Sequence, residues 1–143
     1  MESLSSESFN YEHVEYTVEC DASYDGEVSA AGWNIFGNSS QKDMMEGSLI
    51  LNFNSTTKCE IQSIIIALEE LSEATDESST SIIVRTDYLG VIKKLEDKNQ
   101  HNSQVKELQE SLSKFESWSI ECVNRDKLTR AHDLAKYAIC EYR

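Results

Sequence analysis

Apolar and polar residues alternate along the first third of the chain, in the period-two pattern that is typical of β-strands. This alternation predicts strands over residues 15–21, 30–36 and 47–53, with turns at 24–27 and 37–40 between them. Strands that follow one another through short turns pair antiparallel. The first part of the chain is therefore expected to form a three-stranded meander.

The period changes to that of a helix after the third strand. From Ile61 to Leu71 the apolar residues recur every three or four positions, which predicts an amphipathic helix. Thr57-Lys58-Cys59-Glu60 has the form of a capping box at its start. Later elements are expected at 81–86 (strand), 88–95 (helix), 105–115 (helix), 118–122 (strand) and 128–142 (helix). The pattern predicts an α/β fold with a mixed five-stranded sheet, three antiparallel strands and then alternating helices and strands, and helices packed on it.

Length and composition favour one cytoplasmic domain. Residues 1–12 are acidic and rich in Ser, lack periodicity and are predicted to be a disordered tail, which leaves 13–143 as the domain. No apolar run approaches the ~20 residues of a membrane span, and the start of the chain lacks the pattern of a secretory signal. The four cysteines are scattered, so we expect reduced thiols and no disulfide-linked partner.

The net charge of −13 argues against a broad electropositive face for nucleic acid. It leaves room for a local basic strip, or for contact with phosphates through bound metal ions.

Three acidic residues fall at corresponding places in the predicted elements. Asp21 ends the first strand, Glu60 lies in the first turn of the first helix, and Asp87 ends the fourth strand. If the first and fourth strands are parallel neighbours, both Asp residues emerge at one edge of the sheet. Three carboxylates at that edge repel one another unless cations lie between them. Such a cluster can hold two metal ions roughly 3.5–4 Å apart, the arrangement used for phosphoryl displacement.

Each acid also has a purely structural interpretation. Asp21 suits a turn, Glu60 suits the reciprocal half of a capping box with Thr57, and Asp87 suits the start of the next helix, where a negative charge is favourable. The functional interpretation depends on the order of all three within one sheet.

Four segments of the chain, in order and at comparable spacing, resemble the motifs of the type 1 ribonucleases H. Asp21-Ala22-Ser23 with Ala31-Gly32-Trp33 resembles the family's Asp-Gly-Ser with Ala-Gly-x-Gly, and Ser55-Thr56-Thr57-Lys58-Cys59-Glu60 resembles its Thr-Asn-Asn-x-Ala-Glu. Ile83-Val84-Arg85-Thr86-Asp87-Tyr88 resembles the family's strand ending Thr-Asp-Ser. Arg130-Ala131-His132-Asp133-Leu134-Ala135 resembles its closing x-Ala-Asp-x-Leu-Ala. The resemblance extends from Val14 to Tyr142.

The resemblance implies a ribonuclease H-like fold and an endonuclease, a hydrolase of phosphodiester bonds. It implies cleavage of the RNA strand of RNA–DNA hybrids with two Mg²⁺ or Mn²⁺ ions, leaving 5′-phosphate and 3′-hydroxyl ends. Metal-binding catalytic roles are implied for Asp21, Glu60 and Asp87. We also expect a monomer.

The fourth acid of the family falls on His132, with Asp133 beside it. On a helical wheel His132 flanks the apolar face of the last helix, and Asp133 lies about 100° further round. His132 is therefore the better placed, and an imidazole can bind a metal or handle a proton. A histidine at a helix edge with no role is the alternative.

The chain lacks the long basic protrusion of the larger family members, because residues 96–104 are short and nearly neutral. The loop Asn124-Arg125-Asp126-Lys127 replaces their Gly-His loop and resembles the compact archaeal and plant-type members.

Substrate contacts are expected near the metals, where reading the 2′-hydroxyl distinguishes RNA from DNA. The candidates are the backbone of Ala22 and Ser23, the side chains of Ser55, Thr56 and Thr57, and the basic residues Arg85, Arg125, Lys127 and Arg130. Any single basic residue of this set is also compatible with a solvated surface role.

Two rival functions remain open. One is a ribonuclease H-like domain with weak or no catalysis that acts as an interaction module for nucleic acid or protein. The acidic charge and His132 favour it, while the intact Asp21, Glu60 and Asp87 oppose it. The other is a DNA-cutting or DNA-joining enzyme of the same architecture. Such enzymes usually carry an extra DNA-binding domain, for which 143 residues leave no room.

Overall fold

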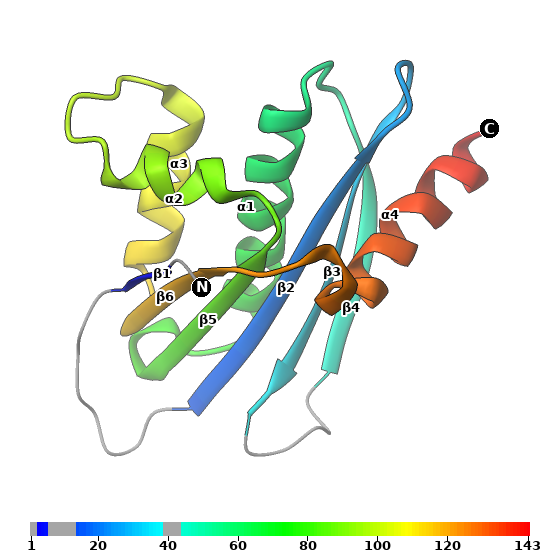
Figure 1. The fold of residues 1–143 in the computed structure, drawn as a ribbon. Helices are drawn as coiled ribbons and strands as arrows, with labels where there is room; N and C mark the ends of the chain where they lie inside the picture. Colours follow the sequence, from blue (N-terminus) through cyan, green and yellow to red (C-terminus); the bar gives the residue numbers. More distant parts are fainter. Residues whose placement is uncertain (1–2, 6–13, 39–43) are drawn as a thin grey trace.

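The computed structural model describes residues 3–5, 14–38 and 44–143, and its fold is shown in Figure 1. In chain order its elements are β1 (Ser3–Ser5), β2 (Val14–Tyr24), β3 (Ser29–Gly37), β4 (Met44–Leu51), α1 (Thr56–Ala74), η1 (Glu77–Ser79), β5 (Thr80–Thr86), α2 (Leu89–Glu96), α3 (Ser103–Ser113), β6 (Ser117–Cys122), η2 (Arg125–Lys127) and α4 (Thr129–Tyr142).

Within the described ranges these strands form one mixed sheet in the order β1-β6-β5-β2-β3-β4. The meander β2-β3-β4 is antiparallel, as predicted, and β5 lies parallel to both β2 and β6. The expected neighbourhood of the first and fourth predicted strands, β2 and β5, is therefore confirmed.

The predicted strand count is wrong by one. The sheet has six strands rather than five, because Ser3–Ser5 pairs antiparallel with β6. These residues belong to the segment 1–12 that the sequence predicts as a disordered tail, and backbone hydrogen bonds to an open sheet edge need no apolar alternation. The other residues of that segment lie outside the described part of the chain.

Asp21 does not end its strand, contrary to the sequence prediction. β2 continues to Tyr24 because residues 21–24 still pair with β3, with Asp21 opposite Gly32. The parallel pairing with β5 stops earlier, at Glu19 and Arg85. Asp21 therefore lies just beyond the point where β5 ends, with one side of its strand no longer paired to β5.

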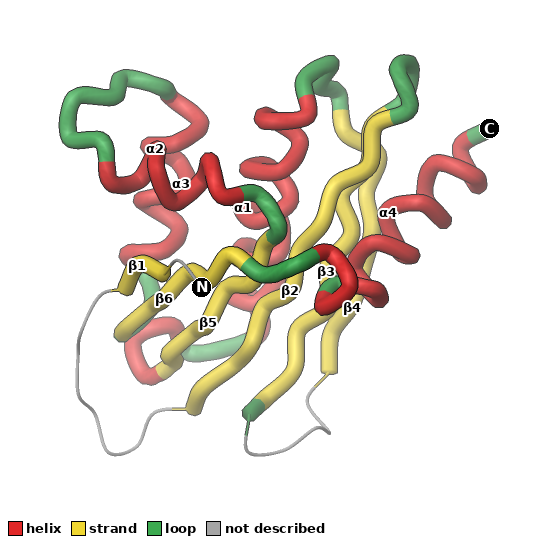
Figure 2. The backbone as a smooth tube through the Cα atoms, in the orientation of Figure 1, coloured by secondary structure: helices red, strands yellow, loops and turns green. Residues whose placement is uncertain are grey.

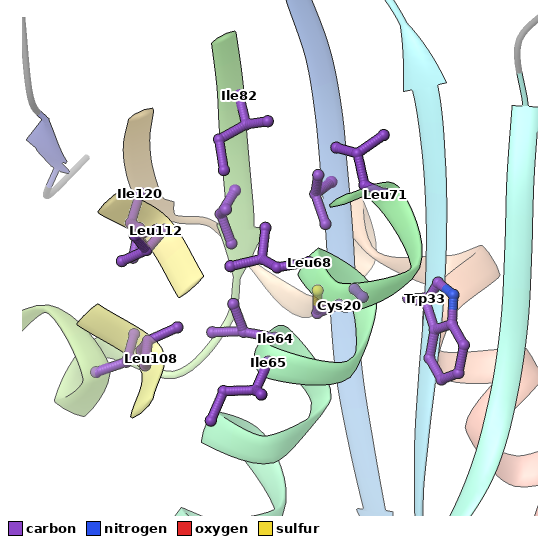
Figure 3. Packing of buried hydrophobic residues seen from close by; sticks show 14 of the residues in the cluster. Cys20, Trp33, Ile64, Ile65, Leu68, Leu71, Ile82, Leu108, Leu112 and Ile120 are labelled. Carbon is purple, nitrogen blue, oxygen red and sulfur yellow. The ribbon is translucent and has the colours of Figure 1, made fainter. Parts of the chain in front are cut away.

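The two faces of the sheet are covered by different helices. α1 packs on the face of Val18, Cys20 and Trp33, where its residues Ile64 and Leu68 are fully buried. Figure 3 shows Ile64 and Leu68 of α1 on the side of the sheet that carries Cys20 and Trp33. α4 packs on the opposite face, lying over β3 in the view of Figure 1. Alternate residues of the central strands thus enter two separate apolar layers.

α4 approaches the sheet closely at Gly32. A Cβ atom at this position would lie 2.1 Å from the Ala131 carbonyl oxygen and 2.5 Å from the Ala135 nitrogen. Because both atoms belong to the helix backbone, the contact requires a residue without a side chain. Gly32 therefore fixes how near α4 stands to β3.

The capping box predicted from Thr57 to Glu60 is wrong. The N-cap of α1 is Ser55, whose hydroxyl accepts a hydrogen bond from the Lys58 backbone N–H at 3.4 Å. Thr57 and Glu60 both lie inside the helix, and Glu60 falls in its second turn rather than its first. Of the helices in the described ranges, none is long and apolar enough to cross a membrane.

Candidate metal centre

The three predicted carboxylates meet at one place. Asp21, Glu60 and Asp87 each offer an oxygen atom, and these atoms all lie within 4.8 Å of one another. They come from β2, from α1 and from the connection between β5 and α2. The predicted clustering is confirmed, although each local placement behind it is inexact: β2 continues beyond Asp21, Glu60 lies in the second turn of α1, and β5 ends one residue before Asp87.

The strand register explains why the two aspartates meet. Glu19 pairs with Arg85, so continuing the same offset beyond the end of β5 places Asp87 beside Asp21. The chain leaves the sheet at this point, as the loop after β5 in Figure 2 shows. Asp87 is thus free of strand geometry, and no side chain among the described residues caps the following helix α2.

The cluster is buried although it is charged. Asp21 is fully buried and Glu60 is 4% exposed, while the Asp87 side chain is 19% exposed. Asp21 Oδ1 and Glu60 Oε2 have no hydrogen-bond partner among the residues that the structure describes. Buried polar atoms without partners are rare in folded proteins, so these two oxygens are the ones that a bound cation would satisfy.

Burial and mutual repulsion change the acidity of the cluster. Burial, followed by the charges of Asp21 and Asp87, raises the pKa of Glu60 from 4.5 to about 9. Burial and the Asp87 charge also raise the pKa of Asp21, against the lowering effect of the His132 hydrogen bond and of Arg125. In the absence of a cation, the site therefore favours a protonated Glu60 at neutral pH.

The donor set suits a hard divalent cation. Mg²⁺ and Mn²⁺ prefer oxygen ligands, carboxylates above all. The buried, unpartnered oxygens of Asp21 and Glu60 are acceptors that such an ion would satisfy. The residues that would hold it are Asp21, Glu60 and Asp87.

His132 stands beside the cluster, as the helical wheel predicts. Its Nδ1 lies 2.7 Å from Asp21 Oδ2, where the imidazole donates to the carboxylate. His132 is half-buried, whereas Asp133 is exposed. The close approach of α4 at Gly32 brings His132 over Asp21, which is the register partner of that glycine.

Arg125 reaches the same carboxylates from η2. Its Nε lies 3.3 Å from Asp87 Oδ2 and 3.9 Å from Asp21 Oδ2, while the side chain remains 58% exposed. The segment after β6 that carries Arg125 crosses towards the loop after β5 (Figure 2). A cation therefore borders the acidic cluster on its solvent side.

The other two candidate arginines, Arg85 and Arg130, form ion pairs away from the cluster. Arg85 donates to Glu19 at 3.1 Å and lies 3.5 Å from Glu121, on the sheet face. Arg130 pairs with Glu46 of β4, and Lys127 is exposed. Of the candidate basic residues in the described ranges, only Arg125 has an ion pair with the cluster.

The polar candidates belong to β2 and to the start of α1, the two elements that carry Asp21 and Glu60. Ala22 is buried and Ser23 is half-buried in β2, directly after Asp21. Ser55 caps α1, Thr56 is exposed, and the Thr57 hydroxyl accepts a hydrogen bond from Tyr88 at 3.1 Å. Sequence reasoning missed Tyr88, since no periodic or motif signal connects residues 57 and 88.

A sequence profile of the reverse transcriptase-like family matches residues 19–138. This stretch contains all three carboxylates and His132. The chain belongs to the reverse transcriptase-like family. No match was found among curated protein sequences.

Solved structures place this family member among the ribonucleases H in fold. It is similar to RNase H1 of the halophilic archaeon Halobacterium salinarum, with a TM-score of 0.77 and 24% identity over 89% of this chain and 98% of the other. It is also similar to the N-terminal RNase H domain of a Mycobacterium tuberculosis protein, with a TM-score of 0.75 and 19% identity over 90% of this chain and 95% of the other.

LC11-RNase H1, whose structure contains an RNA/DNA hybrid, gives a TM-score of 0.73 and 17% identity, over 89% of this chain and 98% of the other. The predicted ribonuclease H-like fold is confirmed.

Proposed function

We propose that this protein is an endonuclease that cleaves the RNA strand of RNA–DNA hybrids and leaves 5′-phosphate and 3′-hydroxyl ends. The observation that carries the proposal is the set of three carboxylates with oxygens within 4.8 Å of one another, two of them buried and without partners among the described residues. The hybrid bound to the structurally similar LC11-RNase H1 supports the substrate class.

Two Mg²⁺ or Mn²⁺ ions are the proposed cofactors. When bound, such ions activate a water molecule and stabilise charge on the departing 3′-oxygen. Asp21, Glu60 and Asp87 would hold them, and ionisation of Glu60 would accompany binding, because a protonated carboxyl is a poor ligand.

His132 and Arg125 are proposed to orient the carboxylates and to neutralise phosphate charge. His132 donates to Asp21 Oδ2 and thereby fixes which Asp21 oxygen faces the cluster. A direct ligand role for His132 stays a prediction, because the group whose ligand atoms lie within 4.8 Å of one another consists of Asp21, Glu60 and Asp87. Arg125 is exposed at the rim and can pair with a phosphate of the hybrid in place of Asp87. The hydroxyls of Ser55, Thr56 and Thr57 and the backbone of Ala22 and Ser23 are the proposed contacts to sugar and phosphate.

The test is a cleavage assay on labelled RNA–DNA hybrid, duplex RNA, duplex DNA and single-stranded RNA, each with Mg²⁺, with Mn²⁺ and with EDTA. We expect cleavage of the hybrid's RNA strand alone, only with metal. Asp87→Asn keeps the side-chain shape but removes the charge, so it should abolish cleavage. Asp97→Asn, at an exposed aspartate after α2, is the matched control and should leave the rate unchanged.

A wild-type chain that binds the hybrid but does not cut it with either metal would refute the nuclease proposal. That outcome would instead support the interaction module that the acidic net charge of −13 favours.

A further inference from the structure

Tyr88 joins the two chain segments that carry Asp87 and Glu60. It follows Asp87 directly, and its hydroxyl donates to Thr57 Oγ1 at 3.1 Å, in the first turn of α1. Its backbone N–H donates to Thr86 Oγ1 at 3.2 Å, at the end of β5. Its ring packs against the apolar core. Tyr88 therefore bridges the end of β5 and the start of α1.

The position of the Tyr88 ring depends on Gly90. A Cβ atom at residue 90 would lie 2.4 Å from both Cζ and the hydroxyl oxygen of Tyr88. The ring thus folds back over the first turn of α2 and occupies the space that any side chain at residue 90 would need. This conformation directs the hydroxyl towards α1.

The hydrogen bond between Tyr88 and Thr57 connects the chain segments that carry Asp87 and Glu60. Thr57 and Glu60 are three residues apart on α1 and so share one face of the helix. Asp87 lies outside both β5 and α2, so the regular hydrogen bonding of neither element holds it. Among the described residues, two side-chain contacts hold this segment: the ion pair of Arg125 with Asp87 and the hydrogen bond from Tyr88 to Thr57, which attaches it to α1.

We propose that Tyr88 is a positioning residue that sets the separation of Asp87 and Glu60 at which both bind one divalent cation. It acts through its hydrogen bond to Thr57 and has no direct contact with the ion. The inference rests on the proposed metal site and adds a residue that determines how tightly that site binds.

The direct test is calorimetric titration of the full chain with MgCl₂ and with MnCl₂, without substrate. Tyr88→Phe removes one oxygen atom and keeps the ring. We expect metal binding about 2- to 10-fold weaker, the range that loss of one hydrogen bond gives. Tyr24→Phe is the matched control, because Tyr24 also donates its hydroxyl to a neighbour, the Gly26 carbonyl, but does so in an exposed turn. The control should bind metal as the wild type does.

The partner residue gives a second arm. Thr57→Val should weaken metal binding as much as Tyr88→Phe, and the double variant should show no further loss, since both remove the same hydrogen bond. Thr57→Ser keeps the hydroxyl and should restore affinity to within about 2-fold. In cleavage assays, Tyr88→Phe should need more Mg²⁺ for half-maximal rate and should recover most of the maximal rate at saturation.

Gly90→Ala separates positioning from stability. The added methyl displaces the Tyr88 ring, so metal binding should weaken as in Tyr88→Phe. Alanine has a higher helix propensity than glycine. The melting temperature of Gly90→Ala in EDTA should therefore fall less than it would if packing were lost throughout the protein.

Two results would overturn the inference: metal affinity of Tyr88→Phe equal to that of wild type, or additive losses in the Tyr88→Phe/Thr57→Val double variant. Either result leaves the proposed nuclease intact as long as the wild type binds metal and cuts the hybrid. A wild-type chain that binds neither Mg²⁺ nor Mn²⁺ would refute the proposed function and this inference together.

Discussion

Replacing Glu60 by glutamine should stabilise the protein in the absence of metal. Burial and repulsion raise the pKa of Glu60 from 4.5 to about 9. At pH 7 the folded state therefore holds a proton on Glu60 that the unfolded state has released. Since the folded state binds this additional proton, the contribution of Glu60 to the free energy of unfolding is most favourable below pH 4.5 and falls as the pH rises towards 9. Glutamine is neutral in both states and avoids this loss.

The size of the effect follows from the shift. Each pH unit between the two pKa values costs about 1.36 kcal/mol, so the interval from 4.5 to pH 7 amounts to about 3 kcal/mol. Local rearrangement and water entry reduce this figure. We expect Glu60→Gln to raise the free energy of unfolding by about 1–3 kcal/mol at pH 7 in EDTA. The amide also brings an N–H donor next to two carboxylates.

The assay is urea unfolding at several pH values between 5 and 8, in EDTA and in MgCl₂. The wild type should lose stability across this range in EDTA and regain it with Mg²⁺, because an ion that binds only the folded state stabilises it. The free energy of unfolding of Glu60→Gln should depend less on pH and should increase less when Mg²⁺ is added. Glu69→Gln, at an exposed glutamate of the same helix, controls for the simple loss of one negative charge.

Parallel pH profiles of wild type and Glu60→Gln in EDTA would refute the reasoning. Such a result would mean that Glu60 is already ionised in the metal-free fold, so that burial and the neighbouring aspartates do not control its proton.

Four further substitutions, at three positions, test other parts of the structure. His132→Ala should lower the rate of hybrid cleavage about 10-fold or more without abolishing it, because Asp21 loses its donor but the carboxylates remain. His132→Asp should raise the ratio of Mg²⁺-supported to Mn²⁺-supported rate, since Mg²⁺ prefers oxygen ligands; an unchanged ratio would make the histidine a bystander. Gly32→Ala should cost about 1–3 kcal/mol in urea unfolding, because its Cβ would meet the α4 backbone. Ile64→Ala, at a fully buried residue of α1, should cost about 2–5 kcal/mol, and a much smaller loss would indicate loose packing there.

The order of the elements and the gathering of the acids could be predicted from the sequence, because both depend on local patterns. Alternation marks β2, a short apolar run marks β5, helical spacing marks α1, and the parallel neighbourhood of the two strands brings Asp21 to Asp87. The contact of His132 with Asp21 was likewise accessible from the helical wheel, since it requires only that the apolar face of α4 lie on the sheet.

The local details could not be predicted, because they depend on partners distant in sequence. Both Ser55 and Thr57 are good N-cap residues, and the fold gives the cap to Ser55 while Thr57 accepts from Tyr88. The strand Ser3–Ser5 forms only because β6 presents an open edge. That Arg125 contacts the cluster while Arg85 pairs with Glu19 follows from where each residue leaves the sheet.

The absence of a side chain at Gly32 has a consequence for how the site can vary among related chains. Because the backbones of α4 and β3 are in direct contact there, the height of residue 132 above Asp21 is set by main-chain atoms and not by the side chains around it. A histidine, an aspartate or a glutamate at that position would project from the same anchored point. The backbone position of residue 132 therefore stays the same when its side chain changes. A single substitution can exchange the fourth group of the site without moving α4.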